Sequence, residues 1–199
     1  MASRKRPKPK VYELRIELDG IVPSVWRRII VPGTITLPEL HDLLQLVMGW
    51  TDSHLHSFTI GKHTYSSKAG NGDLAEMKMI DESGHALVDL LGESVKTFLY
   101  EYDFGDSWEH VLEFEGAHPR EPHARYPRCL AGARACPPED VGGTSGYEDF
   151  LAVIADPEHE EHEDMLHWAG GSFDSEAFSA ERICFDDPRM RWRLAFARG

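Results

Sequence analysis

A chain of 199 residues with 41% hydrophobic and 10% aromatic residues can bury a substantial core, which excludes an intrinsically disordered protein. No apolar run approaches the roughly 20 residues of a membrane-spanning helix, and no apolar signal sequence follows the N-terminal charges. We therefore expect a cytoplasmic protein without a membrane partner. The three cysteines form no C-x-x-C pair, so the sequence predicts no structural disulfide.

The first ten residues differ in charge from the rest of the chain. They hold five of the 21 basic residues and no acid, whereas all 34 acidic residues follow them. An acidic body repels phosphate backbones, which disfavours nucleic-acid binding over the whole surface. We predict a disordered basic arm over 1–10 and a single domain over 11–199. The partner, a protein or a nucleic acid, is unknown; a nucleic acid could be contacted through the basic side chains of the arm, which are Arg4, Lys5, Arg6, Lys8 and Lys10.

The first fifty residues of the domain contain signals for a hairpin and a helix. Alternating apolar residues predict two strands that pair as a hairpin over 11–31. Thr36 and Glu39 then form a capping box, because each side chain can satisfy a backbone amide that the helix leaves unpaired. A helix with one apolar face is predicted over 37–48.

Two further hairpins follow. The period-two pattern predicts one over 54–66 and a second over 97–115, with a turn at Gly105-Asp106-Ser107. Residues 116–144 are rich in proline and glycine and are interpreted as a long loop, which is often functional when it lies inside a compact domain.

The C-terminal third carries helix signals. Ser145 and Glu148 match a capping box that would begin a helix ending near residue 154. Further helices are predicted over 158–168 and 175–182, followed by a strand or helix over 190–196. The expected fold is α+β: an antiparallel or mixed sheet of hairpins with packed helices and a helical C-terminal third.

The pair His54 and His56 is the first candidate site. On a strand, an H-x-H pair directs both rings to the same face, about 7 Å apart along the backbone, where two imidazoles can share a metal. The alternative is that one or both are hydrogen-bonded structural histidines.

A second candidate is the segment 102–110, in which Asp103, Asp106 and His110 crowd a tight turn between aromatic residues. Aromatic neighbours lower the local dielectric and shift pKa values, as catalytic groups require. Ordinary turn chemistry is the alternative.

A third candidate lies in the long loop, where Cys129 and Cys136 could complete a zinc site with nearby histidines and carboxylates. Their spacing matches no standard zinc module, and two small buried cysteines are the alternative.

Several motifs in combination resemble the plasmid pRiA4b ORF-3-like family, which also occurs as passenger proteins of bacterial mobile elements. They are YDFGDSWEH at 102–110, HLHSF at 54–58, and CPPEDVGG at 136–143 followed by Gly146-Tyr147. The resemblance runs from residue 11 to about 184 and implies an α+β fold in a bacterial or archaeal cytoplasm, without a particular activity. It also implies that the motifs converge on one binding cleft, with the residues His54, His56, Tyr102, Asp103, Asp106, Trp108, His110, Glu139, Asp140 and Tyr147.

Two functional hypotheses follow. The first is a binding or accessory module of mobile genetic elements that recognises its partner through the polar cleft. The second is a metal-assisted hydrolase in which His54, His56 and either Asp103 or Asp106 hold a divalent ion such as zinc, with His110 or Glu139 as general base.

Overall fold

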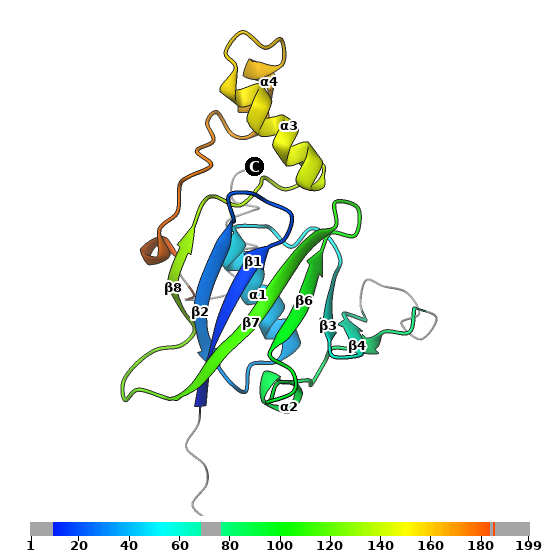
Figure 1. Ribbon diagram of the computed structural model, residues 1–199, viewed down its shortest axis with the longest axis vertical. Helices are drawn as coiled ribbons and strands as arrows, with labels where there is room; N and C mark the ends of the chain where they lie inside the picture. Colours follow the sequence, from blue (N-terminus) through cyan, green and yellow to red (C-terminus); the bar gives the residue numbers. More distant parts are fainter. Residues whose placement is uncertain (1–9, 69–76, 184, 186–199) are drawn as a thin grey trace, which may run out of the picture.

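Eight strands form a single sheet that dominates the protein (Figure 1). The computed structural model describes residues 10–68, 77–183 and 185. Neighbouring strands are antiparallel throughout, except that β4 and β5 are parallel. In sheet order the strands are β5 (Ile80–Asp81), β4 (His63–Ser66), β3 (His56–Ile60), β6 (Thr97–Tyr102), β7 (Trp108–Pro119), β1 (Lys10–Leu18), β2 (Trp26–Pro32) and β8 (Arg128–Ala133).

The three predicted hairpins are present, as β1–β2, β3–β4 and β6–β7. β1 also pairs with β7 along its whole length, which joins the first hairpin to the third. Alternate residues of β1, namely Leu14, Ile16 and Leu18, are almost fully buried, as the period-two pattern predicts for a strand with one face on the core.

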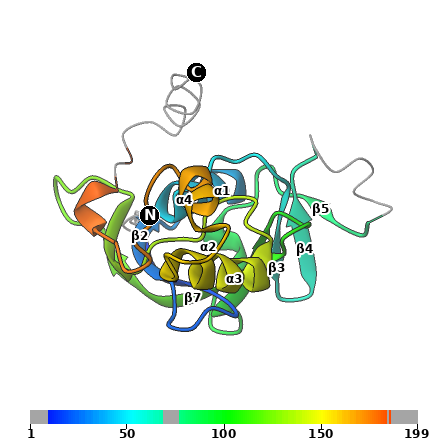
Figure 2. The ribbon, with the colours of Figure 1, turned by 90° about the horizontal axis from the view of Figure 1, so that it is seen from above.

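Helix α1 (Leu37–Met48) has the predicted bounds and lies across one face of the sheet (Figures 1 and 2). The predicted capping box is formed, because Thr36 accepts from the Glu39 amide while the Glu39 carboxylate accepts from the Thr36 amide. Leu37, Leu40 and Leu44 are completely buried in the core against the sheet. This helix and the sheet together form the hydrophobic core.

The prediction of a helical C-terminal third is wrong, and the fold is a sheet-dominated α+β fold. Between residue 134 and residue 183 the regular elements are α3 (Gly143–Ala155), α4 (His162–Trp168) and a single 3-10 turn, η1 (Ala180–Arg182). The acidic run is helical only from His162 onwards, because like charges at helical spacing repel, and Gly170-Gly171 ends the helix. The predicted element over 190–196 lies outside the described residues.

Helix α3 begins three residues earlier than the capping box at Ser145 and Glu148 predicts. Its N-cap is Gly142, and no side chain caps it. A short helix α2 (Leu87–Leu90) precedes β6, and among the described helices none has the length and hydrophobicity to cross a bilayer.

Strand β8 was not predicted, and it occupies part of the segment interpreted as a loop. It pairs with β2 at the edge of the sheet, and its small residues Ala131, Gly132 and Ala133 show no alternating pattern. The buried guanidinium of Arg27 fixes its end, donating to the carbonyl oxygens of Ala133 and Val47 at 2.9 Å each. β8 thereby directs the following loop towards the start of α3.

The capping box generates a prediction about stability. Replacing Thr36 by alanine removes the side-chain acceptor at the helix N-terminus and is expected to lower the free energy of unfolding by about 1 kcal/mol. Chemical denaturation monitored by circular dichroism measures the change. Thr34→Ala, two residues earlier and exposed, is the matched control and should change stability by less than about 0.5 kcal/mol. Equal losses in both variants would contradict the role of the cap.

Candidate metal-binding site

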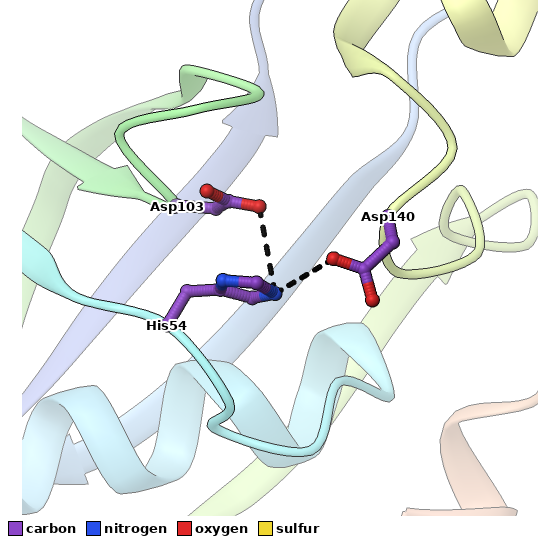
Figure 3. A group of neighbouring side chains, drawn as sticks. All are labelled: His54, Asp103 and Asp140. Atoms are coloured by element: carbon purple, nitrogen blue, oxygen red, sulfur yellow. Dashed lines mark ion pairs between the residues drawn. The ribbon is translucent and has the colours of Figure 1, made fainter.

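Three side chains from distant parts of the chain meet at one end of the sheet (Figure 3). His54 lies in the segment before β3, Asp103 follows β6 directly, and Asp140 belongs to the loop between β8 and α3. Each offers one potential ligand atom, and these atoms all lie within 4.8 Å of one another. Among the described residues this is the only group of three or more His, Cys, Asp or Glu side chains that could hold a metal ion.

The imidazole of His54 lies between the two carboxylates. Its Nε2 atom is 2.8 Å from Asp140 Oδ1 and 3.6 Å from Asp103 Oδ2. Nε2 is shielded from solvent, yet it makes no hydrogen bond to either carboxylate or to any other described residue. A polar atom without a hydrogen bond is costly unless something else satisfies it.

Local backbone geometry directs Asp103 and Asp140 towards His54. Both residues have left-handed conformations, with φ of 57° and 60°, which aspartate tolerates better than most residues. Asp103 Oδ1 accepts from the Gly105 amide at 2.9 Å, so that Oδ2 is left to face His54. Strained backbone conformations of this kind gather at functional sites.

The carboxylate of Glu139 holds the loop of Asp140 beside the segment of His54. One oxygen accepts from both the amide and the hydroxyl of Thr51, and the other accepts from the hydroxyl of Tyr102. The Tyr102 oxygen in turn accepts from the Ser53 amide at 2.9 Å. Burial, and then the hydrogen bond to Glu139, raise the pKa of Tyr102 well above its usual value, so the phenol remains a donor.

Asp106 has a structural partner and does not face His54. Its carboxylate accepts from the Gly142 amide at 3.0 Å, which positions the start of α3. A Cβ atom at Gly143 would lie 2.6 Å from the Asp106 carbonyl oxygen, and Gly143 has φ of 69°, so only glycine fits this contact.

His56 lies away from the cluster, in a buried polar pair. Its Nε2 atom is 2.9 Å from a carboxylate oxygen of the buried Glu82, and its ring stacks on that of His41 at 3.5 Å between centroids. The H-x-H argument assumed that both residues lie on a strand, but β3 begins only at His56. The two rings therefore do not share one face.

His110 is fully buried, and its environment is that of a core residue. Nδ1 lies 3.0 Å from the Trp108 carbonyl oxygen and 3.2 Å from that of Tyr100, and the ring meets Trp50 edge-on. Burial lowers the pKa of His110 to about 4, so the ring stays neutral. Trp108 and Tyr147 are also buried, each with 1% of its surface exposed.

Cys129 and Cys136 are free thiols that flank the guanidinium of Arg27. Burial raises the pKa of both thiols, which favours the neutral form over the thiolate that zinc requires. Neither belongs to the metal-ligating group formed by the described residues.

A cavity of about 490 Å³ opens beside the cluster, lined by residues 52–55 and 103–105. Thr51, Asp52 and Ser53 were not singled out from the sequence, although a polar run between Trp50 and His54 was a usable signal. Asp52 has φ of 60°, and its carboxylate lies 2.7 Å from Nε2 of His41. The segment thus connects the cavity to the buried histidine pair.

The fold and the cluster define a sheet-dominated α+β protein with a His–Asp–Asp group at one end of its sheet. The chain belongs to the plasmid pRiA4b ORF-3-like family, which matches residues 10–182. The predicted family is therefore confirmed.

Two relatives illustrate the family. An uncharacterized protein y4hQ of Sinorhizobium fredii is 40% identical over 189 residues, covering 92% of this chain and 94% of that protein. The crystal structure of the protein of unknown function MM3350 from Methanosarcina mazei Go1 is similar with a TM-score of 0.82 at 38% identity, covering 90% of this chain and all of that one. Relatives of this chain therefore occur in Sinorhizobium fredii and in Methanosarcina mazei, and the second has the same fold.

The buried neutral state of His110 predicts a pH dependence of stability. In the unfolded chain the ring takes up a proton near pH 6.5, whereas in the folded protein it does so only near pH 4. The contribution of the neutral His110 ring to the free energy of unfolding is therefore present above pH 6.5 and is lost as the pH falls towards 4. Between pH 6.5 and 5 the wild type should lose about 2 kcal/mol more stability than His110→Asn, whose amide can replace the Nδ1 donor.

Urea denaturation of both proteins at the two pH values measures this difference, and circular dichroism at pH 7 shows whether the variant is folded. Parallel pH profiles of the wild type and the variant would contradict the assignment of the effect to His110.

Proposed function

We propose that His54 Nε2, Asp103 Oδ2 and Asp140 Oδ1 bind a divalent metal ion, with zinc as the best match to this ligand set. In a tetrahedral zinc site neighbouring ligand atoms are about 3.4 Å apart, since Zn–N and Zn–O bonds are about 2.0–2.2 Å long. The two separations of 2.8 and 3.6 Å from Nε2 lie on either side of that value. The single observation that carries the proposal is the shielded Nε2 atom, which faces two carboxylates without a hydrogen bond.

The proposed reaction type is metal-assisted hydrolysis. Three protein ligands leave a fourth position for water, which is the arrangement of catalytic rather than structural zinc sites. A bound metal lowers the pKa of such a water to about 7 and polarises the bond under attack. The cavity lined by residues 52–55 and 103–105 lies directly beside the cluster and provides room for a substrate.

Compared with the hydrolase hypothesis from the sequence, Asp140 takes the place of His56 and Asp106 in the proposed ligand set. Both of these residues have other partners, Glu82 and the Gly142 amide. Glu139 is proposed as a positioning residue, because both of its oxygens accept hydrogen bonds from Thr51 and Tyr102. His110 is buried among backbone carbonyl groups, which does not favour it as a general base.

The second candidate is a binding or accessory module, with the mobile-element setting that the family name suggests. The observation in its favour is that most polar residues of the predicted cleft are engaged in internal contacts. Beyond the three proposed ligands, Glu139, Asp106 and His56 all hold neighbouring segments together. Such a cleft would serve recognition through its shape and a bound metal, without turnover.

Isothermal titration of chelator-treated protein with Zn²⁺ tests the metal site. We expect one ion per chain. His54→Ala and Asp140→Asn should each weaken zinc binding at least about tenfold, because each variant loses one of the three ligands. Asp19→Asn is the matched control: it removes another exposed aspartate, in the turn after β1, and should leave the affinity unchanged.

No stoichiometric binding by the wild type, or equal affinities of Asp140→Asn and Asp19→Asn, would reject the metal site and leave His54 as an ordinary ion-pair partner. If zinc binds, the loaded protein is assayed with p-nitrophenyl acetate and bis(p-nitrophenyl) phosphate. Turnover that His54→Ala abolishes supports a hydrolase, whereas tight zinc binding without turnover of either substrate favours the binding module.

A further inference from the structure

A groove of about 530 Å³ lies between α3 and α4, separate from the cavity beside His54. The two helices stand beyond the end of the sheet that carries the candidate metal site (Figure 1). Apolar side chains in the lining include Phe150, Met165 and Trp168, and Trp168 is 48% exposed. Carboxylates also line the groove, from Asp140, Asp149, Glu161 and Asp164. An exposed aromatic ring among acids is suited to a ligand that is both apolar and cationic.

The net charge of the protein lies in the stretch of chain that contains this groove. Residues 135–181 contain 13 acidic residues and no lysine or arginine. The other 21 acidic residues of the chain are balanced by its 21 basic residues, so this stretch accounts for the whole net charge of −13. A positively charged segment is therefore attracted to this end of the molecule, most strongly at low ionic strength.

The chain itself contains a segment with the complementary chemistry. Residues 1–10 carry five basic side chains, no acid, and prolines at positions 7 and 9. Proline-containing segments bind aromatic-lined grooves as preformed extended helices, and flanking basic residues pair with acids at the rim. Pro7 and Pro9 match the exposed ring of Trp168, and the neighbouring lysines and arginines match the carboxylates.

The geometry favours the arm of another copy over that of the same chain. β1 begins at Lys10, whereas its other end adjoins α3: a Cβ atom at Gly20, just past β1, would lie 3.1 Å from the Thr144 side chain. The nine residues of β1 span about 30 Å, and nine arm residues reach at most about 30 Å when fully extended. An arm that folded back along its own sheet would reach no farther than the start of α3.

We propose that the groove between α3 and α4 binds residues 4–9 of a second copy of this chain. In an antiparallel two-fold dimer each copy can donate its arm to the other, since β1 begins at the end of the sheet opposite the groove. This inference is independent of the proposed metal site, and its test avoids Asp140, the residue that the groove and the metal cluster share.

Sedimentation velocity of the full chain over a range of concentrations is the first experiment. We expect association that strengthens with concentration, weakens at high salt and is lost when residues 2–9 are deleted. A full chain that stays monomeric at low salt, or a deletion variant that associates equally well, overturns the proposal. A peptide of residues 1–12 that binds the deletion variant while the full chain stays monomeric would assign the groove to the arm of the same chain, and also overturns it.

Isothermal titration calorimetry of that peptide with the deletion variant then shows where on the protein the peptide binds. Asp149→Asn with Asp164→Asn removes two charges from the groove lining, and Glu158→Gln with Glu160→Gln removes two exposed charges outside it. The first pair should weaken peptide binding about fivefold or more, and the second by about twofold or less. Equal weakening by both pairs would mean general charge attraction and would overturn the groove as the binding site.

Discussion

The carboxylate of Glu139 is the contact on which the arrangement of the candidate site depends. It accepts hydrogen bonds from Thr51, which follows α1, and from Tyr102, which ends β6. Charge-assisted hydrogen bonds of this kind are stronger than neutral ones, especially when partly buried. By tying the loop before α3 to two other segments, Glu139 places Asp140 beside His54. Residues separated by more than eighty positions in the chain meet through this one side chain.

The same end of the molecule shows how backbone strain and hydrogen bonding offset each other. Asp52, Asp103 and Asp140 all adopt left-handed conformations around the candidate site. Such conformations cost free energy and persist only when the surrounding contacts hold them. Here the contacts are specific: Gly105 donates to Asp103, and His41 pairs with Asp52. Asp103 and Asp52 are thereby held in fixed directions, which is what metal binding or recognition requires.

Local patterns predicted local structure well. The capping box at Thr36 and the apolar stripe of α1 are contained within one turn or one face, so the sequence specifies them directly. Patterns that depend on a neighbour were misread: β8 forms because β2 offers an edge, and Ser145 does not cap α3 because Asp106 holds the Gly142 amide. The acidic C-terminal third resembled a series of helices, although like charges and glycines interrupt it.

The sequence by itself determined the family, the three hairpins, helix α1 and the uneven distribution of charge. These features rest on periodicity, short motifs and composition, which need no knowledge of long-range contacts. Only the tertiary structure decided that His54, Asp103 and Asp140 meet, and that His56, Asp106 and His110 are engaged elsewhere. The reason is that side-chain direction at the ends of strands and in loops is set by hydrogen bonds between segments far apart in the chain, and these leave no local pattern in the sequence.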